Sequence, residues 1–111
     1  MQKDSYIWKQ SYIMLTKDYI LKTLKEHKPE LLKFGIRYVG LFGSYSREEP
    51  SGNSDIDILI DFEPGKDNFD NFMAVYDFLE KLFKNQKIEV VTKNGLSPYT
   101  GSEILNEVIY A

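Results

Sequence analysis

Two aspartates separated by one residue, Asp55 and Asp57, are the side chains of this chain best suited to chemistry. In an extended strand, residues two apart lie on the same face, so both carboxylates would point the same way while Ile56 and Ile58 point the other way. Two like charges at this spacing repel each other unless a cation lies between them, and carboxylate oxygens are ligands that Mg²⁺ prefers. The pair therefore predicts a site for a divalent metal ion.

A second candidate feature lies about ten residues before the aspartates, where Gly43 and Ser44 follow an apolar stretch. Gly43 would let the backbone approach a ligand closely, and Ser44 could cap a following helix whose free amides attract phosphate. Arg47, one turn later, could reach a bound phosphate, or it could form an ion pair with Glu48 or Asp55 instead. An amide-rich corner that faces a carboxylate pair predicts a site for a metal-bound nucleoside triphosphate.

The pattern of apolar residues predicts elements that bring these two features together. Strands are predicted over 36–42 and 55–62, and a turn over 50–53 makes them antiparallel. An amphipathic helix over 68–85 leads to a strand over 87–92, and such a crossover makes the second and third strands parallel. The predicted fold class is α/β (α+β), with a three-stranded mixed sheet flanked by helices. Further helices are predicted over 16–27, 29–34, 44–48 and 101–110.

Parallel pairing would place a third carboxylate, that of Glu89, level with Asp55 and Asp57. An unpaired acid on a buried strand costs several kcal/mol, so an acid here is expected to have a role. Asp55, Asp57 and Glu89 are predicted to converge in a cluster of the size of a metal site. In a metal-free protein their repulsion would spread them somewhat, because nothing then offsets it. Asp61 shares the face, but at ~3.3 Å per residue it lies roughly 20 Å from Asp55, too far for the same metal site.

Part of this pattern resembles the signature of the DNA polymerase beta-like nucleotidyltransferase superfamily, and more narrowly its minimal nucleotidyltransferase (MNT) branch of single small domains. The family pattern is Gly-Ser, an Arg shortly after, a spacer near ten residues, and Asp-x-Asp. The resemblance runs from about residue 16 to the C-terminus. It is carried by Gly43, Ser44, Arg47, Ser54, Asp55 and Asp57.

The resemblance implies the nucleotidyltransferase fold and metal-dependent nucleotidyl transfer from ATP, the default substrate, to a hydroxyl acceptor. It assigns Asp55, Asp57 and Glu89 to catalysis and to two Mg²⁺ ions. Glu89 departs from the family, which usually has Asp at this position. The positions implied in nucleotide binding are Gly43, Ser44, Arg47 and Ser54.

A domain this small lacks the substrate-binding module of larger relatives, so the resemblance also implies a protein partner. That partner would be a HEPN-type toxin, and this chain would be the antitoxin that adenylylates it on a tyrosine. Two alternatives remain open. The chain could be a catalytically weak antitoxin that neutralises its partner by contact, or it could transfer a nucleotide to a small molecule, as aminoglycoside-modifying enzymes do.

Composition limits the remaining possibilities. A chain of 111 residues suits one domain, predicted over 16–111, with residues 1–15 as an extension whose aromatics could cover a partner or homodimer surface. A net charge of −3 makes nucleic acid an unlikely partner, because such binding relies on cationic groups. The absence of cysteine and of long apolar runs fits a cytoplasmic protein without a membrane segment.

Overall fold

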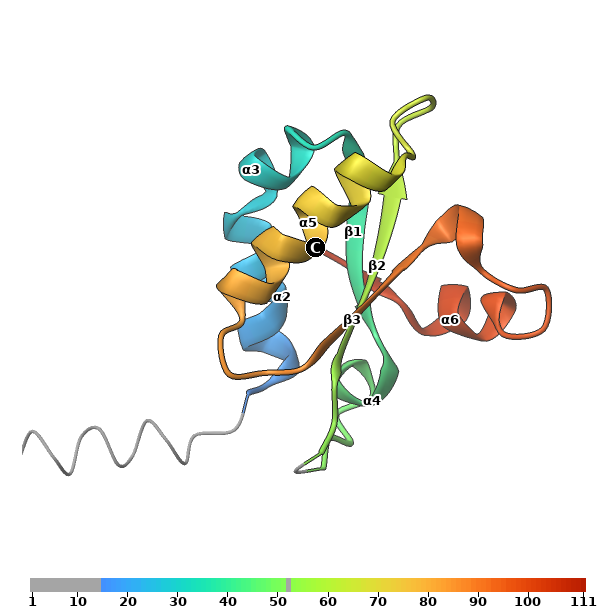
Figure 1. The fold of residues 1–111 in the computed structure, drawn as a ribbon. Helices are drawn as coiled ribbons and strands as arrows, with labels where there is room; N and C mark the ends of the chain where they lie inside the picture. The colour runs from blue at the N-terminus through green and yellow to red at the C-terminus, as the bar shows by residue number, and fades with distance from the viewer. Residues whose placement is uncertain (1–14, 52) are drawn as a thin grey trace, which may run out of the picture.

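The computed structural model describes residues 15–51 and 53–111, which form a four-stranded mixed sheet with helices on both faces (Figure 1). The strands lie in the order β3-β2-β1-β4. Their bounds are Ile36–Phe42 (β1), Ile56–Phe62 (β2), Ile88–Thr92 (β3) and Ile109–Tyr110 (β4). The helices are α2 (Lys17–Glu26), α3 (Lys28–Leu32), α4 (Gly43–Ser46), α5 (Phe69–Leu82), the 3₁₀ turn η1 (Lys93–Gly95) and α6 (Gly101–Glu107).

The strand pairing predicted from the sequence is confirmed. β1 and β2 are antiparallel, with Phe42 opposite Asp57, and β2 and β3 are parallel, with Asp57 opposite Glu89. The α/β fold class is therefore as predicted. This pairing places the end of β1 beside the start of β2, and that juxtaposition positions the candidate site.

The helices predicted around the sheet form for identifiable local reasons. Thr16 caps α2 by accepting the N–H of Tyr19 at 3.1 Å, and Asn68 caps α5 by accepting the N–H of Asn71 at 2.9 Å. Such caps satisfy amides that have no partner within the helix. α5 ends at Leu82, earlier than predicted, because the backbone at the next residue is no longer helical.

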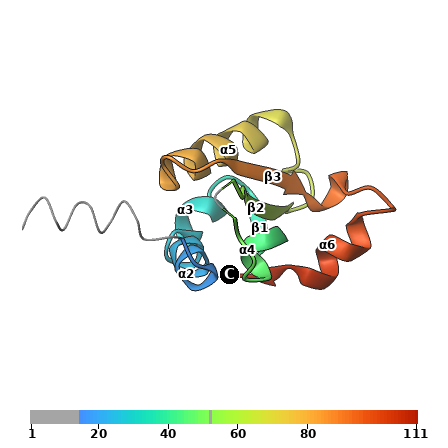
Figure 2. The same ribbon diagram turned by 90° about the horizontal axis from the view of Figure 1, so that it is seen from below.

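One face of the sheet is covered by α2, α3 and α5, and α6 lies on the other side (Figure 2). The core lies on the first face, where Ile56, Ile58 and Ile60 of β2 are fully buried. Each such isoleucine contributes about 1.5–3 kcal/mol relative to an exposed position. Because these isoleucines alternate with Asp55 and Asp57, the sheet presents its acidic residues on the opposite face.

The closing helix predicted over 101–110 is present but shorter, and the predicted number of strands was wrong, because a fourth strand follows the helix. α6 ends at Glu107, and the chain then pairs antiparallel with β1 as β4, with Gly40 opposite Tyr110. A methyl group on Gly40 would lie 2.7 Å from Cγ2 of Val108, so the missing side chain gives the C-terminal segment room to approach. The β-branched residues Val108 and Ile109 also favour the extended conformation.

The predicted extension over 1–15 lies outside the described residues except for Leu15, which packs against the core. The partner or homodimer surface predicted there therefore stays a prediction. In the described part of the chain no helix is long and apolar enough to cross a membrane.

Candidate active site

The acidic face of β2 and β3 is the centre of the candidate site. Asp57 and Glu89 lie directly opposite each other in the parallel ladder, and Asp55 precedes Asp57 by two residues on the same face. Asp57 is half-buried, whereas Glu89 is exposed. The three predicted carboxylates therefore share one surface, and they come from two neighbouring strands.

Glu89 differs from the prediction in its environment. β3 is an edge strand, not a buried one, and the carboxylate of Glu89 is open to solvent. The cost of burying an unpaired charge therefore does not require Glu89 to have a role. Its exposure instead leaves it accessible to a molecule that approaches the sheet from outside.

Gly43 lies against Asp57, as the topology predicted for the corner at the end of β1. Its φ is +79°, a backbone conformation that residues other than glycine rarely adopt. A Cβ at this position would overlap with Oδ2 of Asp57 and would lie 2.9 Å from Cγ of Asp57. Both features require glycine at this position. The backbone of the corner and the carboxylate row are thus in direct contact.

The crowding of acidic groups changes the protonation of Asp57. The pKa of Asp57 is raised from 3.8 to about 7, first by burial of the carboxyl group and then by the neighbouring carboxylate of Glu89. The charges of Asp55 and Glu107 act in the same direction. The carboxylates are therefore close enough to influence one another strongly, and a divalent cation among them would relieve the repulsion.

The carboxylates have the right chemistry for Mg²⁺ but are not gathered as ligands. Over residues 15–51 and 53–111, no group of three or more acidic, histidine or cysteine side chains is arranged so that it could hold a metal ion. Asp57 and Glu89 are adjacent, and hard oxygen donors of this kind fit magnesium. The side chains would have to turn toward one another to enclose an ion.

The predicted roles of the residues around the corner have mixed outcomes. Ser44 does not cap α4, because the helix already begins at Gly43, and the hydroxyl of Ser46 instead donates to the carbonyl of Gly43 at 2.7 Å. Ser54 closes the turn before β2 by accepting the N–H of Ser51 at 2.8 Å. Whether Ser44 or Ser54 binds nucleotide stays a prediction.

Arg47 forms ion pairs, but not with the residues considered from the sequence. Its Nε donates to Glu49 at 3.1 Å and its Nη1 donates to Glu107 at 2.9 Å. The hydrogen bond with Glu107, and then that with Glu49, raise the pKa of the Arg47 guanidinium. The side chain is half-exposed and lies at the same corner as Gly43.

Glu107 is the site residue that sequence reasoning missed. Its Oε2 accepts the N–H of Gly43 at 2.6 Å, while its Oε1 accepts from Arg47. Glu107 is 64 residues from Gly43 in the chain, and the predicted helix over 101–110 gave no sign of its orientation. Only the observed end of α6 and the pairing of β4 with β1 bring it to the corner.

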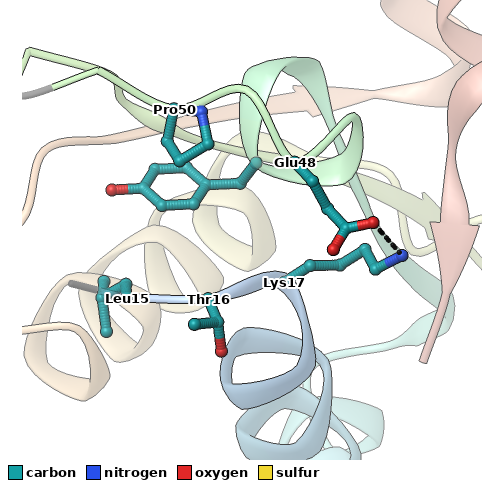
Figure 3. Close-up of a pocket in the computed structure, with 6 residues that line it drawn as sticks. Leu15, Thr16, Lys17, Glu48 and Pro50 are labelled. Carbon is teal, nitrogen blue, oxygen red and sulfur yellow. Dashed lines mark hydrogen bonds and ion pairs between the residues drawn. The ribbon is translucent and has the colours of Figure 1, made fainter. Parts of the chain in front are cut away.

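Among the described residues, a polar hollow near this region contains predicted site residues, and an apolar cavity nearby does not. A polar hollow of about 320 Å³ is lined by Asn53, Ser54, Asp55, Asn85, Gln86 and Lys87. A mainly apolar cavity of about 230 Å³ lies between the start of α2 and α4 with its following loop, where Lys17 and Glu48 form an ion pair of 3.3 Å (Figure 3). Its lining residues are Leu15, Thr16, Lys17, Tyr45, Glu48 and Pro50. Of the predicted site residues, Ser54 and Asp55 line the polar hollow.

Comparison with known proteins is consistent with this geometry. The chain matches the model of the nucleotidyltransferase domain over residues 18–111. It is 39% identical over 98 residues to the protein adenylyltransferase MntA of Thermococcus cleftensis. The matched stretch covers 87% of this chain and 97% of that protein. It is also 41% identical over 81 residues to a candidate protein adenylyltransferase of Methanocaldococcus jannaschii, covering 73% of this chain and 85% of that protein.

Solved structures show the same fold. A candidate minimal nucleotidyltransferase superposes with a TM-score of 0.64 at 30% identity, covering 80% of this chain and 93% of the other. A toxin–antitoxin crystal structure with AMP-PNP gives a TM-score of 0.58 at 23% identity over 86% of this chain and 72% of that chain, a likeness of fold alone. The chain belongs to the nucleotidyltransferase domain family, as a minimal member homologous to protein adenylyltransferases.

Proposed function

We propose that this chain transfers the adenylyl group of ATP to a hydroxyl of a partner protein. The observation that carries the proposal is the contact between Gly43 and Asp57, which joins a phosphate-binding type of backbone corner to a row of carboxylates. Nucleotidyl transfer needs both, because the phosphates must be held while the charge that develops on them is neutralised. The names of the relatives support adenylyl as the transferred group.

In the proposed reaction the acceptor oxygen attacks the α-phosphorus of ATP. A bond forms between these two atoms, the bond to the bridging oxygen breaks, and pyrophosphate leaves with the electron pair. Glu89, which is exposed beside Asp57, would take the proton of the acceptor hydroxyl. Gly43, Ser44, Arg47 and Ser54 would hold the nucleotide.

Mg²⁺ is the ion that fits the proposed donors. Asp55, Asp57 and Glu89 would hold it, and the proposal includes two ions, as the family resemblance implies. When bound, the metal would neutralise charge on the attacking and leaving oxygens. The protein supplies the oxygen donors and the half-buried position of Asp57, which strengthens its attraction to a cation.

The proposed acceptor is a tyrosine of a HEPN-type toxin, and the chain would act as its antitoxin. A neighbouring solved structure is a toxin–antitoxin complex of MntA, which supports a partner of this kind. The described residues form one small domain with no second module for an acceptor, so the partner would supply that surface itself. This part of the proposal rests on relatives more than on the geometry of the site.

A second candidate function is supported by the site itself. In the described part of the chain the carboxylates are not gathered around an ion, and Glu107 occupies the amide of Gly43. These features fit an antitoxin that neutralises its partner by contact and has little or no transferase activity. A small-molecule transferase would share the chemistry of the first proposal but not the acceptor.

One experiment separates these functions. The chain is incubated with α-labelled ATP and Mg²⁺, with and without its co-purified partner. Transfer of label to the partner supports the first function, and release of pyrophosphate that depends on an added aminoglycoside would support a small-molecule transferase. A partner that is neutralised without any label would show that contact alone is responsible.

A further inference from the structure

The carboxylate of Glu107 accepts hydrogen bonds from the Gly43 amide and the Arg47 guanidinium, the two donors that the proposed function assigns to the phosphates of the nucleotide. One carboxylate oxygen accepts the N–H of Gly43 at 2.6 Å, and the other accepts from Nη1 of Arg47 at 2.9 Å. The side chain of Glu107 is only about one quarter exposed, so this arrangement lies in a partly desolvated corner. Charge-assisted hydrogen bonds of this length are among the stronger ones in proteins.

A carboxylate and a terminal phosphate group seek the same kind of donor. Both present anionic oxygens that accept from backbone N–H groups and from the fork of an arginine. The amide of Gly43 has a single hydrogen, so it cannot bond fully to Glu107 and to a phosphate at once. An incoming triphosphate would therefore have to replace Glu107 at this amide.

The other acidic residues make joint occupancy less favourable. Asp57 lies against Gly43, and the carboxylate of Glu107 is near enough to act on it. A triphosphate would add several negative charges beside both groups. Like charges at such distances repel, so departure of Glu107 from the corner would relieve part of the repulsion.

We propose that Glu107 is a further residue of the nucleotide site, an internal anion that occupies the corner of Gly43 and Arg47 in the nucleotide-free protein and competes with the phosphates of the substrate. Until the triphosphate arrives, Glu107 accepts hydrogen bonds from the Gly43 amide and the Arg47 guanidinium. The proposal rests on the proposed function only in taking this corner as the phosphate site. Its consequence is a weaker affinity for nucleotide than the corner alone would give.

The test compares affinities for inorganic tripolyphosphate in the presence of Mg²⁺, measured by calorimetry. Glu107→Gln keeps the shape and an acceptor for the Gly43 amide but loses the charge. We expect it to bind tripolyphosphate about fivefold more tightly than the wild type, the scale of one screened ion pair. With ATP as substrate, the KM should fall by a similar factor while kcat changes less.

Three further variants separate competition from other effects. Glu103→Gln removes an exposed carboxylate from the same helix and should leave the affinity within about twofold, a control for net charge. Glu49→Gln removes the other partner of Arg47 without touching the Gly43 amide, so it should have a smaller effect than Glu107→Gln. Glu107→Asp, which keeps the charge, should restore an affinity near that of the wild type.

The outcomes distinguish this inference from the proposed function. Weaker or unchanged binding by Glu107→Gln would overturn the inference, because Glu107 would then organise the site or play no part in it. If neither protein bound tripolyphosphate, the inference would also fall. If Glu107→Gln bound more tightly but no protein transferred label, the inference would stand and the proposed transfer would be wrong.

Discussion

Asp57 links the chemistry of the site to the stability of the fold at the scale of one side chain. It is half-buried, its pKa is raised to about 7, and it lies between the backbone of Gly43 and the carboxylate of Glu89. In the metal-free protein the ionised form of Asp57 is therefore unfavourable. A group placed for function in this way reduces the stability of the fold when its ligand is absent.

The raised pKa predicts the direction of a pH dependence. Between pH 3.8 and about 7 the folded protein binds more protons at Asp57 than the unfolded chain, so the free energy of unfolding falls as pH rises through this range. Asp57→Asn removes this contribution. At pH 8 we expect the free energy of unfolding of the metal-free variant to exceed that of the wild type by about 1 kcal/mol, which raises the melting temperature by about 4 °C. This free energy is smaller than the full pKa shift would give, because solvent partly screens the charge of Asp57.

The measurement is thermal unfolding in a chelating buffer from pH 4 to pH 8. The difference between the two proteins should shrink toward pH 4, where Asp57 is protonated in the folded protein and only about half ionised in the unfolded chain, so little of the penalty for ionising it in the fold remains. Asp77→Asn, which changes an exposed aspartate of α5 on the other face of the sheet, should follow the wild type. A lower melting temperature for Asp57→Asn at pH 8 would show that the carboxylate stabilises the fold.

Glu89 is exposed, which makes its proposed role testable without loss of folding. Glu89→Asp should keep the rate of transfer within about tenfold, a change in the barrier of about 1.4 kcal/mol. Glu89→Gln should lower the rate by at least about a hundredfold, because it removes a proposed metal ligand and a proposed base. Single-turnover rates with saturating ATP and Mg²⁺ give the comparison.

Glu80→Gln, on the exposed surface of α5, serves as the matched control for Glu89→Gln and should transfer like the wild type. An unchanged rate in Glu89→Gln would leave Asp55 and Asp57 as the only carboxylates needed. If the wild type were inactive and Glu89→Asp gained activity, the contact-only antitoxin would be the better account.

At the scale of elements, the turn from β1 into α4 determines whether the two parts of the site meet. Gly43→Ala should prevent transfer, because its methyl group would overlap with the Asp57 carboxylate and its positive φ disfavours a side chain. Gly65→Ala is a close control, since Gly65 has a φ of +81° but nothing lies within 4 Å of the added methyl group.

Both variants carry the backbone strain of a positive φ, of order 1 kcal/mol for alanine. Only Gly43→Ala also crowds Asp57. We expect Gly65→Ala to be mildly destabilised and fully active, and Gly43→Ala to lose more stability and essentially all transfer, as measured by denaturant unfolding and label transfer. Equal activity in the two variants would mean that the contact between Gly43 and Asp57 is not required.

The pairing of β1, β2 and β3 could be predicted because it follows from local signals. The alternation of Ile56, Ile58 and Ile60 with acidic residues identifies the buried face, and the short turn and the helical crossover define the strand directions. The register then brings Glu89 level with Asp57. A single sequence contains all of this information.

The C-terminal part of the fold could not be predicted in the same way. Whether Val108 and Ile109 continue a helix or form a strand depends on the unoccupied edge of β1 and on the space beside Gly40, which are properties of the assembled sheet. The contact of Glu107 with Gly43 follows from that pairing. Tertiary packing overrode the helical pattern, and the error extended to the site.

At the scale of the whole molecule, the sheet separates two tasks. One face, covered by α2, α3 and α5, holds the core, while the other face and its edge carry the carboxylates, the Gly43 corner and α6 (Figure 2). The fold thus keeps the proposed chemistry apart from the core that stabilises it.

The most direct test of the central claim is the intact mass of the partner after incubation with the chain, ATP and Mg²⁺. With the wild type and with Asp77→Asn, the account predicts that the partner gains the mass of an adenylyl group. With Asp55→Asn or Asp57→Asn, folded as judged by thermal unfolding, no gain is expected. An unmodified partner with the wild type would show that the chain does not transfer an adenylyl group to it, and full modification by the Asp57→Asn variant would show that Asp57 is not required.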